Sequence, residues 1–371
     1  MKLGVYIHIP FCKRKCNYCD FLSSSDTTDM DAYLKKLKDE IEYYKSSCSN
    51  YEVDTVFVGG GTPSVLRTGA LSEILDTLFR LFRISNNPEI TVEANPDTLD
   101  VDKVTEYSLC ATRVSVGVQS LSNKVLKVAG RLHDENGARR ALGLLSQTNL
   151  DVSTDLMLGL PLDDLDGVIY STKGILDYGI GHLSAYGLKV EENTKFYKVL
   201  KENEKIFPDD DLVADMYDKV VHIAKSYGLE RYEVSNFAKV GSECKHNVGY
   251  WRRKPYLGLG VGAHSLLSDV RYENTSNIKE YLQSKDFSLV RKVESKLTVE
   301  DKLFEEIMLG LRLRDGINLK EINDSYGINF LEKFSEPLRK LDGVLERNND
   351  KICVKEGYFY ALNSIIVEFL N

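Results

Sequence analysis

Short β-rich runs alternate with amphipathic stretches through the first half of this 371-residue chain, and no other feature limits its possible folds so strongly. Such alternation is typical of parallel strands joined by crossover helices. Six strand–helix units are more than one mononucleotide-binding half contains and fewer than the eight of a closed barrel. The sequence therefore predicts an α/β fold, an open partial (β/α)6 barrel. The six expected strands lie near residues 3–9, 55–58, 90–94, 113–118, 152–158 and 183–188.

The second half of the chain departs from this alternation after residue 191. The charged run 284–296 has little apolar periodicity and predicts a linker between two domains. Helical stretches and then short β-like pieces follow it, which predicts a small helical, winged-helix-like C-terminal domain. We expect the barrel and its extension to occupy residues 1–283 and the small domain to occupy residues 297–371.

Composition narrows the class of protein. Lys and Arg number 48 against 56 Asp and Glu, a formal net charge of -8, without a dense basic stripe, so nucleic acid is not an expected partner. The N-terminus lacks a signal-peptide pattern, and no apolar run approaches the roughly 18 residues of a membrane span. We expect a cytoplasmic protein, with peripheral membrane contact and a homodimer left open.

Three of the seven cysteines cluster in one loop after the first expected strand. Cys12, Cys16 and Cys19 have the spacing C-x3-C-x2-C, and in a reducing compartment clustered cysteines indicate metal ligands rather than disulfides. Structural zinc sites, the competing interpretation, usually pair two knuckles, and no second knuckle exists here. Electron-transfer clusters take four cysteines, so three predict a [4Fe-4S] cluster with one iron open to another ligand.

Glycines and polar residues follow several of the expected strands. Gly59, Gly60, Gly61 and Thr62 come directly after the second strand, where successive glycines let the backbone approach a ligand closely, although an ordinary strand-exit turn is the alternative. Polar side chains at the carboxyl ends of barrel strands converge over the barrel mouth. Each alone could also be a solvated loop residue. The candidates beyond the second strand are Glu93, Gln119, Arg131 and Asp155.

The cysteine spacing, with Tyr18 directly before the last cysteine, resembles the hallmark of the radical S-adenosylmethionine superfamily. That resemblance implies that the amino and carboxylate groups of S-adenosylmethionine chelate the open iron. It also implies that one electron from the cluster cleaves the cofactor to methionine and a 5'-deoxyadenosyl radical, and that the fold is a partial barrel.

Further motifs narrow the resemblance. The runs YIHIPFC, CDF, GGGTP, VEANP, GVQS and DLMLGLP together resemble the family that groups oxygen-independent coproporphyrinogen III dehydrogenase with haem chaperones, over essentially the whole chain. The resemblance implies a site for S-adenosylmethionine in which Glu93 binds the ribose hydroxyls, and it leaves open a second cofactor molecule. The residues expected to line this site are Tyr6, Tyr18, Gly60, Gly61, Thr62, Glu93, Gln119, Arg131 and Asp155.

Two features weigh against the dehydrogenase within this family. Its motif continues to C-x3-C-x2-C-x-C, whereas Phe21 stands here in place of the fourth cysteine. The dehydrogenases also carry an N-terminal extension that helps to build the substrate site, and here the first strand is expected at residue 3. That part of a substrate site is therefore expected to be absent.

A third feature favours a haem carrier. His246, Asn247, Tyr250 and Trp251 lie in the run HNVGYW, which resembles the H-N-x-x-Y-W motif of the haem chaperones. An imidazole can ligate haem iron, and Trp and Tyr offer flat apolar surface to the macrocycle. The basic residues that follow, Arg252, Arg253 and Lys254, could pair with haem propionates.

The axial ligand of such a haem stays open. A lone histidine is more often a satisfied loop residue than a ligand. Cys244, two residues before His246, offers an alternative thiolate, and His264 in GVGAHS is a weaker candidate. His8 shares a strand face with Tyr6, where either support of the cluster loop or core packing is expected.

The function predicted from the sequence is a haem chaperone that holds a [4Fe-4S] cluster, S-adenosylmethionine and haem. Its expected partners are haem-accepting proteins, in this family respiratory ones. The alternative is an oxygen-independent coproporphyrinogen III dehydrogenase of porphyrin biosynthesis, which the same fold would host. Whether the chain is an enzyme is left open.

Overall fold

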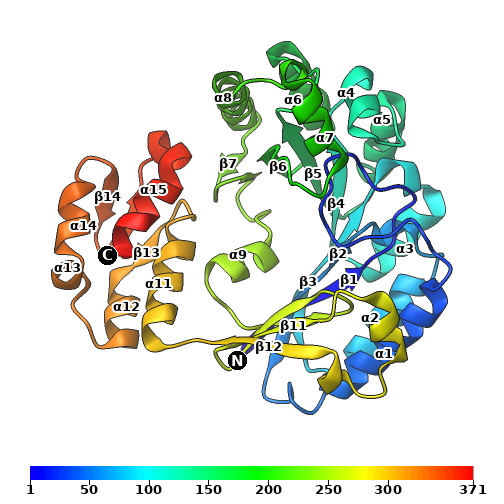
Figure 1. Ribbon diagram of the computed structural model, residues 1–371, viewed down its shortest axis with the longest axis horizontal. Helices are drawn as coiled ribbons and strands as arrows, with labels where there is room; N and C mark the ends of the chain where they lie inside the picture. The colour runs from blue at the N-terminus through cyan, green and yellow to red at the C-terminus, as the bar shows by residue number, and fades with distance from the viewer. Residues whose placement is uncertain (371) are drawn as a thin grey trace.

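A computed structural model describes residues 1–370 of the chain (Figure 1). The first part is built on one large sheet. Its strands are β1 (Lys2–Ile9), β2 (Glu52–Gly60), β3 (Ile84–Ala94), β4 (Arg113–Gln119), β5 (Asp151–Leu158), β6 (His182–Gly187), β7 (Glu230–Arg231), β8 (Asn236–Ala238), β9 (Tyr256–Leu259), β10 (His264–Leu267), β11 (Val270–Asn274) and β12 (Arg291–Lys296). Its helices are α1 (Met30–Tyr44), α2 (Ala70–Leu81), α3 (Val101–Cys110), α4 (Asn123–Ala129), α5 (Glu135–Leu145), α6 (Leu165–Leu176), α7 (Lys195–Glu202), α8 (Asp210–Ser226), α9 (Lys245–Trp251) and α10 (Ile278–Gln283).

The sheet is open, as predicted. Among the described residues its order is β12-β11-β10-β9-β1-β2-β3-β4-β5-β6-β8-β7, with β7 and β12 as free edges. Strands β1 to β6 pair in parallel in sequence order, and β9 joins β1 in parallel. The six predicted strands are these six parallel strands, and the partial (β/α)6 architecture is confirmed.

Side chains alternate between the two faces of the sheet because successive residues of a strand point to opposite sides. In β1, Val5, Ile7 and Ile9 are fully buried in the main core, whereas Tyr6 and His8 face the other way. Figure 1 shows α1 to α6 on the outer side of the strands and α9 on the inner side. The outer face of β1 therefore belongs to the main core, and the inner face carries Tyr6 and His8.

The predicted linker 284–296 is wrong in the structure. β12 pairs with β11 at the edge of the large sheet, and Phe287 just before it is 5% exposed. The first domain thus continues through residue 296, beyond the predicted end at residue 283. Charged side chains on an edge strand stay in solvent and discourage pairing with other chains, so a strand of this kind has the composition of a linker.

The C-terminal part has its own sheet, β13-β15-β14, and its own buried core, from Leu303 to Phe369. This confirms the predicted helical, winged-like region, which lies to one side of the large sheet in Figure 1. Its elements are α11 (Val299–Gly310), β13 (Ile317–Asn318), α12 (Leu319–Tyr326), α13 (Phe330–Lys333), α14 (Ser335–Lys340), β14 (Leu345–Asn348), β15 (Lys351–Val354) and α15 (Leu362–Val367). The 3-10 helices among residues 1–370 are Pro63–Val65, Pro96–Thr98, Glu204–Ile206, Phe287–Leu289, Glu356–Ala361 and Glu368–Leu370.

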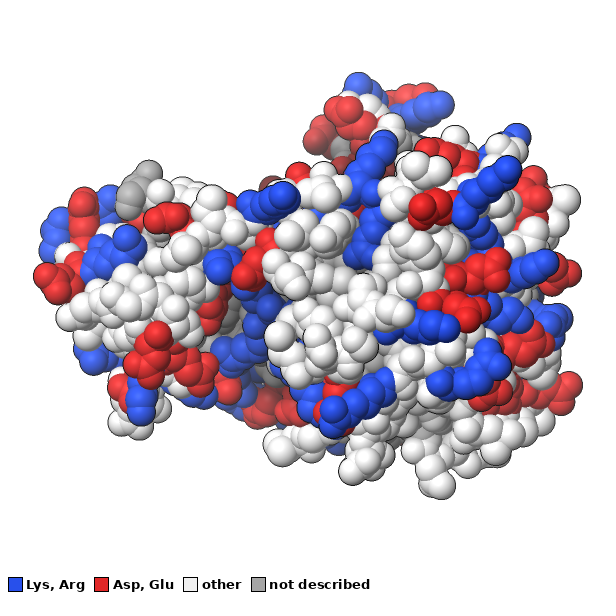
Figure 2. Space-filling model, turned by 90° about the horizontal axis from the view of Figure 1, so that it is seen from below, with Lys and Arg blue, Asp and Glu red and all other residues white. Residues whose placement is uncertain are grey.

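The surface mixes both charge signs. Figure 2 shows Lys and Arg interspersed with Asp and Glu on the face that it presents, without a broad stripe of either sign. Across residues 1–370, no helix combines the length and the apolar character that crossing a membrane requires.

Candidate cluster and cofactor site

The three clustered cysteines lie in the loop between β1 and α1 and line one cavity of about 370 Å³. Hydrogen bonds within the loop and from a distant helix hold this loop in place. The backbone N–H of Cys12 donates to the carbonyl of Ser24 at 2.9 Å, and Asn17 Nδ2 donates to the carbonyl of Val128 at 2.8 Å. The loop is thus held from within and from α4.

A chain of hydrogen bonds connects two of the cysteine sulfurs. Thr62 Oγ1 donates to Cys12 Sγ at 3.4 Å and accepts from Asn95 Nδ2 at 3.0 Å. Arg131 Nη2 donates to Asn95 Oδ1 at 2.7 Å, and its Nη1 lies 3.3 Å from Cys16 Sγ. Donors of this kind stabilise thiolates. Sequence reasoning missed Asn95, although it directly follows the third expected strand in VEANP.

The three cysteines have the donor chemistry of iron–sulfur cluster ligands. Among residues 1–370, no three His, Cys, Asp or Glu groups surround one point where a metal ion could bind. In an iron–sulfur cluster each cysteine binds a different iron, so three sulfurs along one cavity wall suffice.

Eight of the nine residues predicted to bind S-adenosylmethionine line this same cavity; they are Tyr18, Gly60, Gly61, Thr62, Glu93, Gln119, Arg131 and Asp155. Tyr6 is the exception. Its ring stacks on Phe57 with centroids 6.2 Å apart, its hydroxyl lies 3.0 Å from His8 Nδ1, and it lines a neighbouring cavity instead. The structure therefore brings together all predicted cofactor residues except Tyr6.

Two carboxyl groups in the cavity have perturbed pKa values. Burial, with the nearby charge of Asp155, raises the pKa of Glu93 to about 7. Burial also raises the pKa of Asp155 to about 6. The hydrogen bond that Ser115 Oγ donates to it at 3.3 Å opposes this rise. Glu93 Oε2 accepts from the Gly60 N–H at 3.1 Å, so the carboxyl group is held at the glycine turn with acceptor capacity left for a ligand.

The glycine run is required by packing within the protein. Gly60 has a φ of 109°, and a Cβ at this position would lie 2.4 Å from the His8 ring. A Cβ on Gly61 would lie 2.7 Å from the carbonyl oxygen of Phe11. The end of β2 thus approaches the cluster loop more closely than any side chain permits. The sequence predicts these glycines as a place where the backbone approaches a ligand closely. Packing within the protein is a second reason for them.

The inner face of the sheet also carries polar side chains that sequence reasoning did not single out. They alternate along their strands, which is the signal that could have found them. Within residues 1–370 the buried Nη2 of Arg113 and Oγ1 of Thr91 have no hydrogen-bond partner. The members of this set that line the cavity are Thr91, Arg113, Ser115, Ser153, His182 and Ser184.

The predicted haem motif forms α9, and its members do not share one surface. His246 is 3% exposed, and burial lowers the pKa of its imidazole to about 3. Its Nδ1 lies 2.8 Å from Thr55 Oγ1 and its Nε2 lies 2.9 Å from the Tyr250 hydroxyl, so both ring nitrogens are occupied. Asn247 lines the cluster cavity, while the Trp251 ring lies 5.9 Å from the Arg312 guanidinium of the C-terminal part.

The alternative ligand Cys244 is no more available. It is 2% exposed, and burial with the adjacent Glu89 charge raises the pKa of its thiol to about 12. Glu89 also accepts the backbone N–H groups of Lys245 and His246, at 2.8 and 2.9 Å. A buried carboxylate at the first turn of α9 thus secures the helix against β3.

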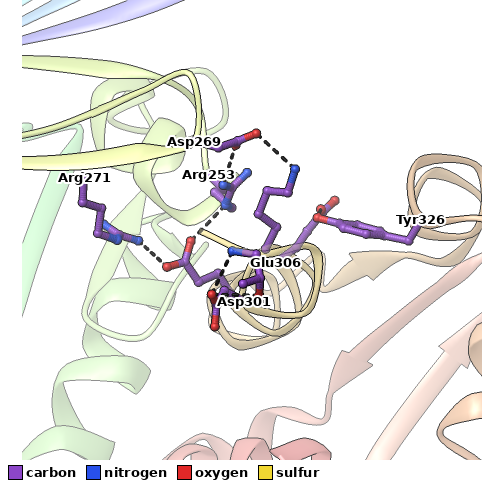
Figure 3. A network of polar contacts seen from close by, with 9 residues as sticks. Arg253, Asp269, Arg271, Asp301, Glu306 and Tyr326 are labelled. Carbon is purple, nitrogen blue, oxygen red and sulfur yellow. Dashed lines mark hydrogen bonds and ion pairs between the residues drawn. The ribbon is translucent and has the colours of Figure 1, made fainter. Parts of the chain in front are cut away.

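Two of the three basic residues after the motif connect the two parts of the chain. Arg252 donates to the carbonyl of Gly316 at 2.8 Å and Arg253 belongs to the contacts in Figure 3, whereas Lys254 lies 3.9 Å from Asp54 of β2. Arg253 donates to Asp269 at 2.8 Å and to Glu305 at 2.9 Å, and Arg271 donates to Glu305 at 2.6 Å. Lys302 of α11 donates to Asp269 at 3.1 Å. This network, which we call the interdomain network, joins the β10–β11 turn to α11.

Comparisons with known proteins agree with this geometry. An open parallel sheet with a three-cysteine loop at its carboxyl edge is the architecture of a radical S-adenosylmethionine protein. Residues 6–169 match the family model described as the radical SAM superfamily, and residues 297–357 match the HemN C-terminal domain. The Escherichia coli coproporphyrinogen III oxidase HemN, described as a radical SAM enzyme, has the same fold, with a TM-score of 0.87 at 22% identity over 99% of this chain and 89% of that one.

Two similar proteins carry the name heme chaperone HemW. The one from Bacillus subtilis (strain 168) is 33% identical over 99% of both chains, and the one from Escherichia coli (strain K12) is 36% identical over 84% of this chain and 82% of its own. The chain belongs to the HemW family within the radical SAM superfamily. Membership of that superfamily implies a [4Fe-4S] cluster and S-adenosylmethionine.

Proposed function

We propose that this chain is a haem chaperone that binds a [4Fe-4S] cluster, S-adenosylmethionine and haem, and delivers haem to haem-requiring proteins. The observation that carries the proposal is the 33% identity to a protein named heme chaperone over 99% of both chains. The alternative, an oxygen-independent coproporphyrinogen III dehydrogenase, rests on the fold shared with HemN, and at 22% identity that likeness concerns the fold alone. Phe21, in place of a fourth cysteine, also favours the chaperone.

In this proposal the chain's own residues hold the two resident cofactors. Cys12, Cys16 and Cys19 bind three irons, and the hydrogen bonds from Thr62 and Arg131 to two of the sulfurs support this assignment. The carboxyl group of Glu93 binds the ribose hydroxyls of S-adenosylmethionine, for which its position in the same cavity provides room. The cofactor, when bound, supplies a 5'-deoxyadenosyl radical.

Haem delivery implies haem-accepting proteins as partners. We propose that the recipients are respiratory haem proteins and that the chaperone acts from the cytoplasm through peripheral contact with the membrane, as a monomer or a homodimer. The family resemblance supports this proposal. Pull-down of recipients by the haem-loaded chain, compared with the haem-free chain, tests it.

The decisive experiment divides one anaerobically reconstituted preparation between two assays. The first is a haem titration followed at the Soret band. The second is conversion of coproporphyrinogen III with S-adenosylmethionine and a reductant. We expect saturable haem binding and no decarboxylation; turnover without haem binding would reverse the assignment.

A further inference from the structure

We propose that haem binds in a second cavity beside the cluster cavity, with His264 as an axial ligand. The inference rests on the proposed haem-chaperone function and names the site of that function. The cavity measures about 480 Å³ and lies between β1, β9–β11, the residues after α9 and Leu309 of α11. Cavities of this size hold cofactors and other small molecules.

His264 has the geometry of an available ligand. It opens β10, lines the cavity, and its side chain is 51% exposed. Its Nδ1 lies 3.3 Å from Glu294 Oε2, and its Nε2 has no hydrogen-bond partner among residues 1–370. Histidine ligands of metals usually donate one ring N–H to a carboxylate and present the other nitrogen to the metal. The spacing of His264 Nδ1 and Glu294 Oε2 matches this arrangement.

The competing histidines are occupied. His8 also lines the cavity, but its Nδ1 contacts the Tyr6 hydroxyl at 3.0 Å and its Nε2 contacts the carbonyl of Leu22 at 2.8 Å. His246 has both ring nitrogens engaged and is almost fully buried. Ligation through either one would break buried hydrogen bonds and leave their partners unsatisfied, which is unfavourable.

The cavity walls suit a flat apolar macrocycle. Tyr6, Tyr250 and Tyr256 contribute rings, and the last two meet edge to face with centroids 4.8 Å apart. Phe21 is 72% exposed and lines both this cavity and the cluster cavity. Covering these rings with a porphyrin would remove apolar surface from water. Tyr250 of the HNVGYW motif thus reaches the site through its ring, although His246 does not.

Positive charge at the rim suits the two haem propionates. Arg253 and Arg271 line the cavity and belong to the interdomain network (Figure 3). Their guanidinium groups pair with Asp269 and Glu305, Glu294 also lies near Arg271, and Lys254 adds a third cation to the cavity lining. Guanidinium groups match carboxylate geometry and bind it strongly. A dianionic tetrapyrrole is therefore the occupant that the rings, the rim and the imidazole together favour.

The position of Phe21 places the proposed haem next to the cluster. Phe21 lines both cavities, and it stands where the dehydrogenases of the family have a fourth cysteine. A haem against one face of Phe21 would lie beside the cavity that holds the cluster cysteines. Phe21, whose presence in place of a cysteine argues against the dehydrogenase, thus lines the proposed haem site.

The test titrates ferric haem into the anaerobically reconstituted full chain and its His264→Ala and His246→Ala variants. We expect His264→Ala to weaken binding at least tenfold and to shift the Soret band and the electron paramagnetic resonance signal. Added imidazole should restore both signals, which loss of a merely structural side chain would not allow. The matched control is His222→Ala, at an exposed position on α8, which should bind as the parent chain does.

Each other outcome has one meaning. An unchanged spectrum and affinity for His264→Ala would overturn the inference while leaving the haem-chaperone function intact, and a changed spectrum for His246→Ala alone would assign the ligand to the motif. Absence of haem binding by the parent chain would refute the proposed function itself. If His264→Ala loses its iron content or its circular dichroism, Phe21→Ala decides instead: weaker binding with an unshifted Soret band supports the site, and unchanged affinity contradicts it.

Discussion

Replacing Glu93 by Gln should stabilise the protein while weakening its hold on S-adenosylmethionine. A carboxyl group whose pKa is higher in the folded than in the unfolded chain keeps its proton more tightly when folded. Its contribution to the free energy of unfolding therefore falls as the pH rises from about 4.5 towards 7. Gln keeps an oxygen for the Gly60 N–H but never ionises, so the variant avoids this loss.

The magnitude follows from the pKa values. The rise from 4.5 to about 7, at about 1.36 kcal/mol for each pKa unit, gives about 3 kcal/mol at pH 8. This is an upper bound, because the carboxyl group faces the cavity and part of its charge is solvated. At pH 5 the folded chain still holds the proton while the unfolded chain has lost most of it, so the difference between Glu93→Gln and the parent should fall to about a quarter, roughly 1 kcal/mol.

Urea denaturation followed by tryptophan fluorescence at pH 5, 6, 7 and 8 measures this difference, since Trp251 is the chain's one tryptophan. The matched control is Glu73→Gln. Hydrogen bonds from Arg67 and Lys38 lower the pKa of this exposed carboxyl group, so its loss should not stabilise the chain at any of these pH values. An equal effect of Glu93→Gln at pH 5 and pH 8 would refute the desolvation argument. Equilibrium titration with S-adenosylmethionine should show weaker binding by the variant.

Three further substitutions test the structural account. Gly60→Ala should lower the free energy of unfolding by about 1–3 kcal/mol or more, because the position has a positive φ and the added Cβ would lie 2.4 Å from the His8 ring. A thermal melt measures this loss. Gly187→Ala is the control and should have little effect, because its Cβ would meet nothing within 4 Å. Glu305→Gln should speed hydrogen exchange of α11, since it weakens two ion pairs of the interdomain network, and unchanged exchange would mean that the network does not hold that helix. Lys103→Met should cost about 3–5 kcal/mol in urea denaturation, because it leaves a buried carboxylate without its partner at 3.1 Å, and a cost under 1 kcal/mol would contradict that reasoning.

Much of the fold was predictable because its signals are local. The alternation of apolar and polar residues in each parallel strand is decided by which face of that strand is covered, so it can be found within a few residues of sequence. β12 was the failure. Its six residues, Arg291–Lys296, read as a linker because an exposed edge strand has no apolar face to reveal it.

The haem motif shows a different limit of prediction from the sequence. His246 is recognisable in the sequence, but its hydrogen bond to Thr55 joins residues 191 positions apart. Burial and partner choice depend on which strand packs against α9, and no short pattern carries that information. The same holds for Asn95, which matters because Thr62 and Arg131 reach it from other parts of the chain.

By itself the sequence determined the strand order of the parallel units, the cysteine triplet and most of the residues around the cluster cavity. Spacing within one loop and position at a strand end are local properties, and the parallel sheet gathers all its strand ends at one edge. Only the tertiary structure decided which histidine of the second cavity has a free nitrogen, that Tyr6 and Phe21 line that cavity, and that Arg253 reaches α11. These depend on contacts between distant segments, where packing and desolvation decide what each side chain can bind.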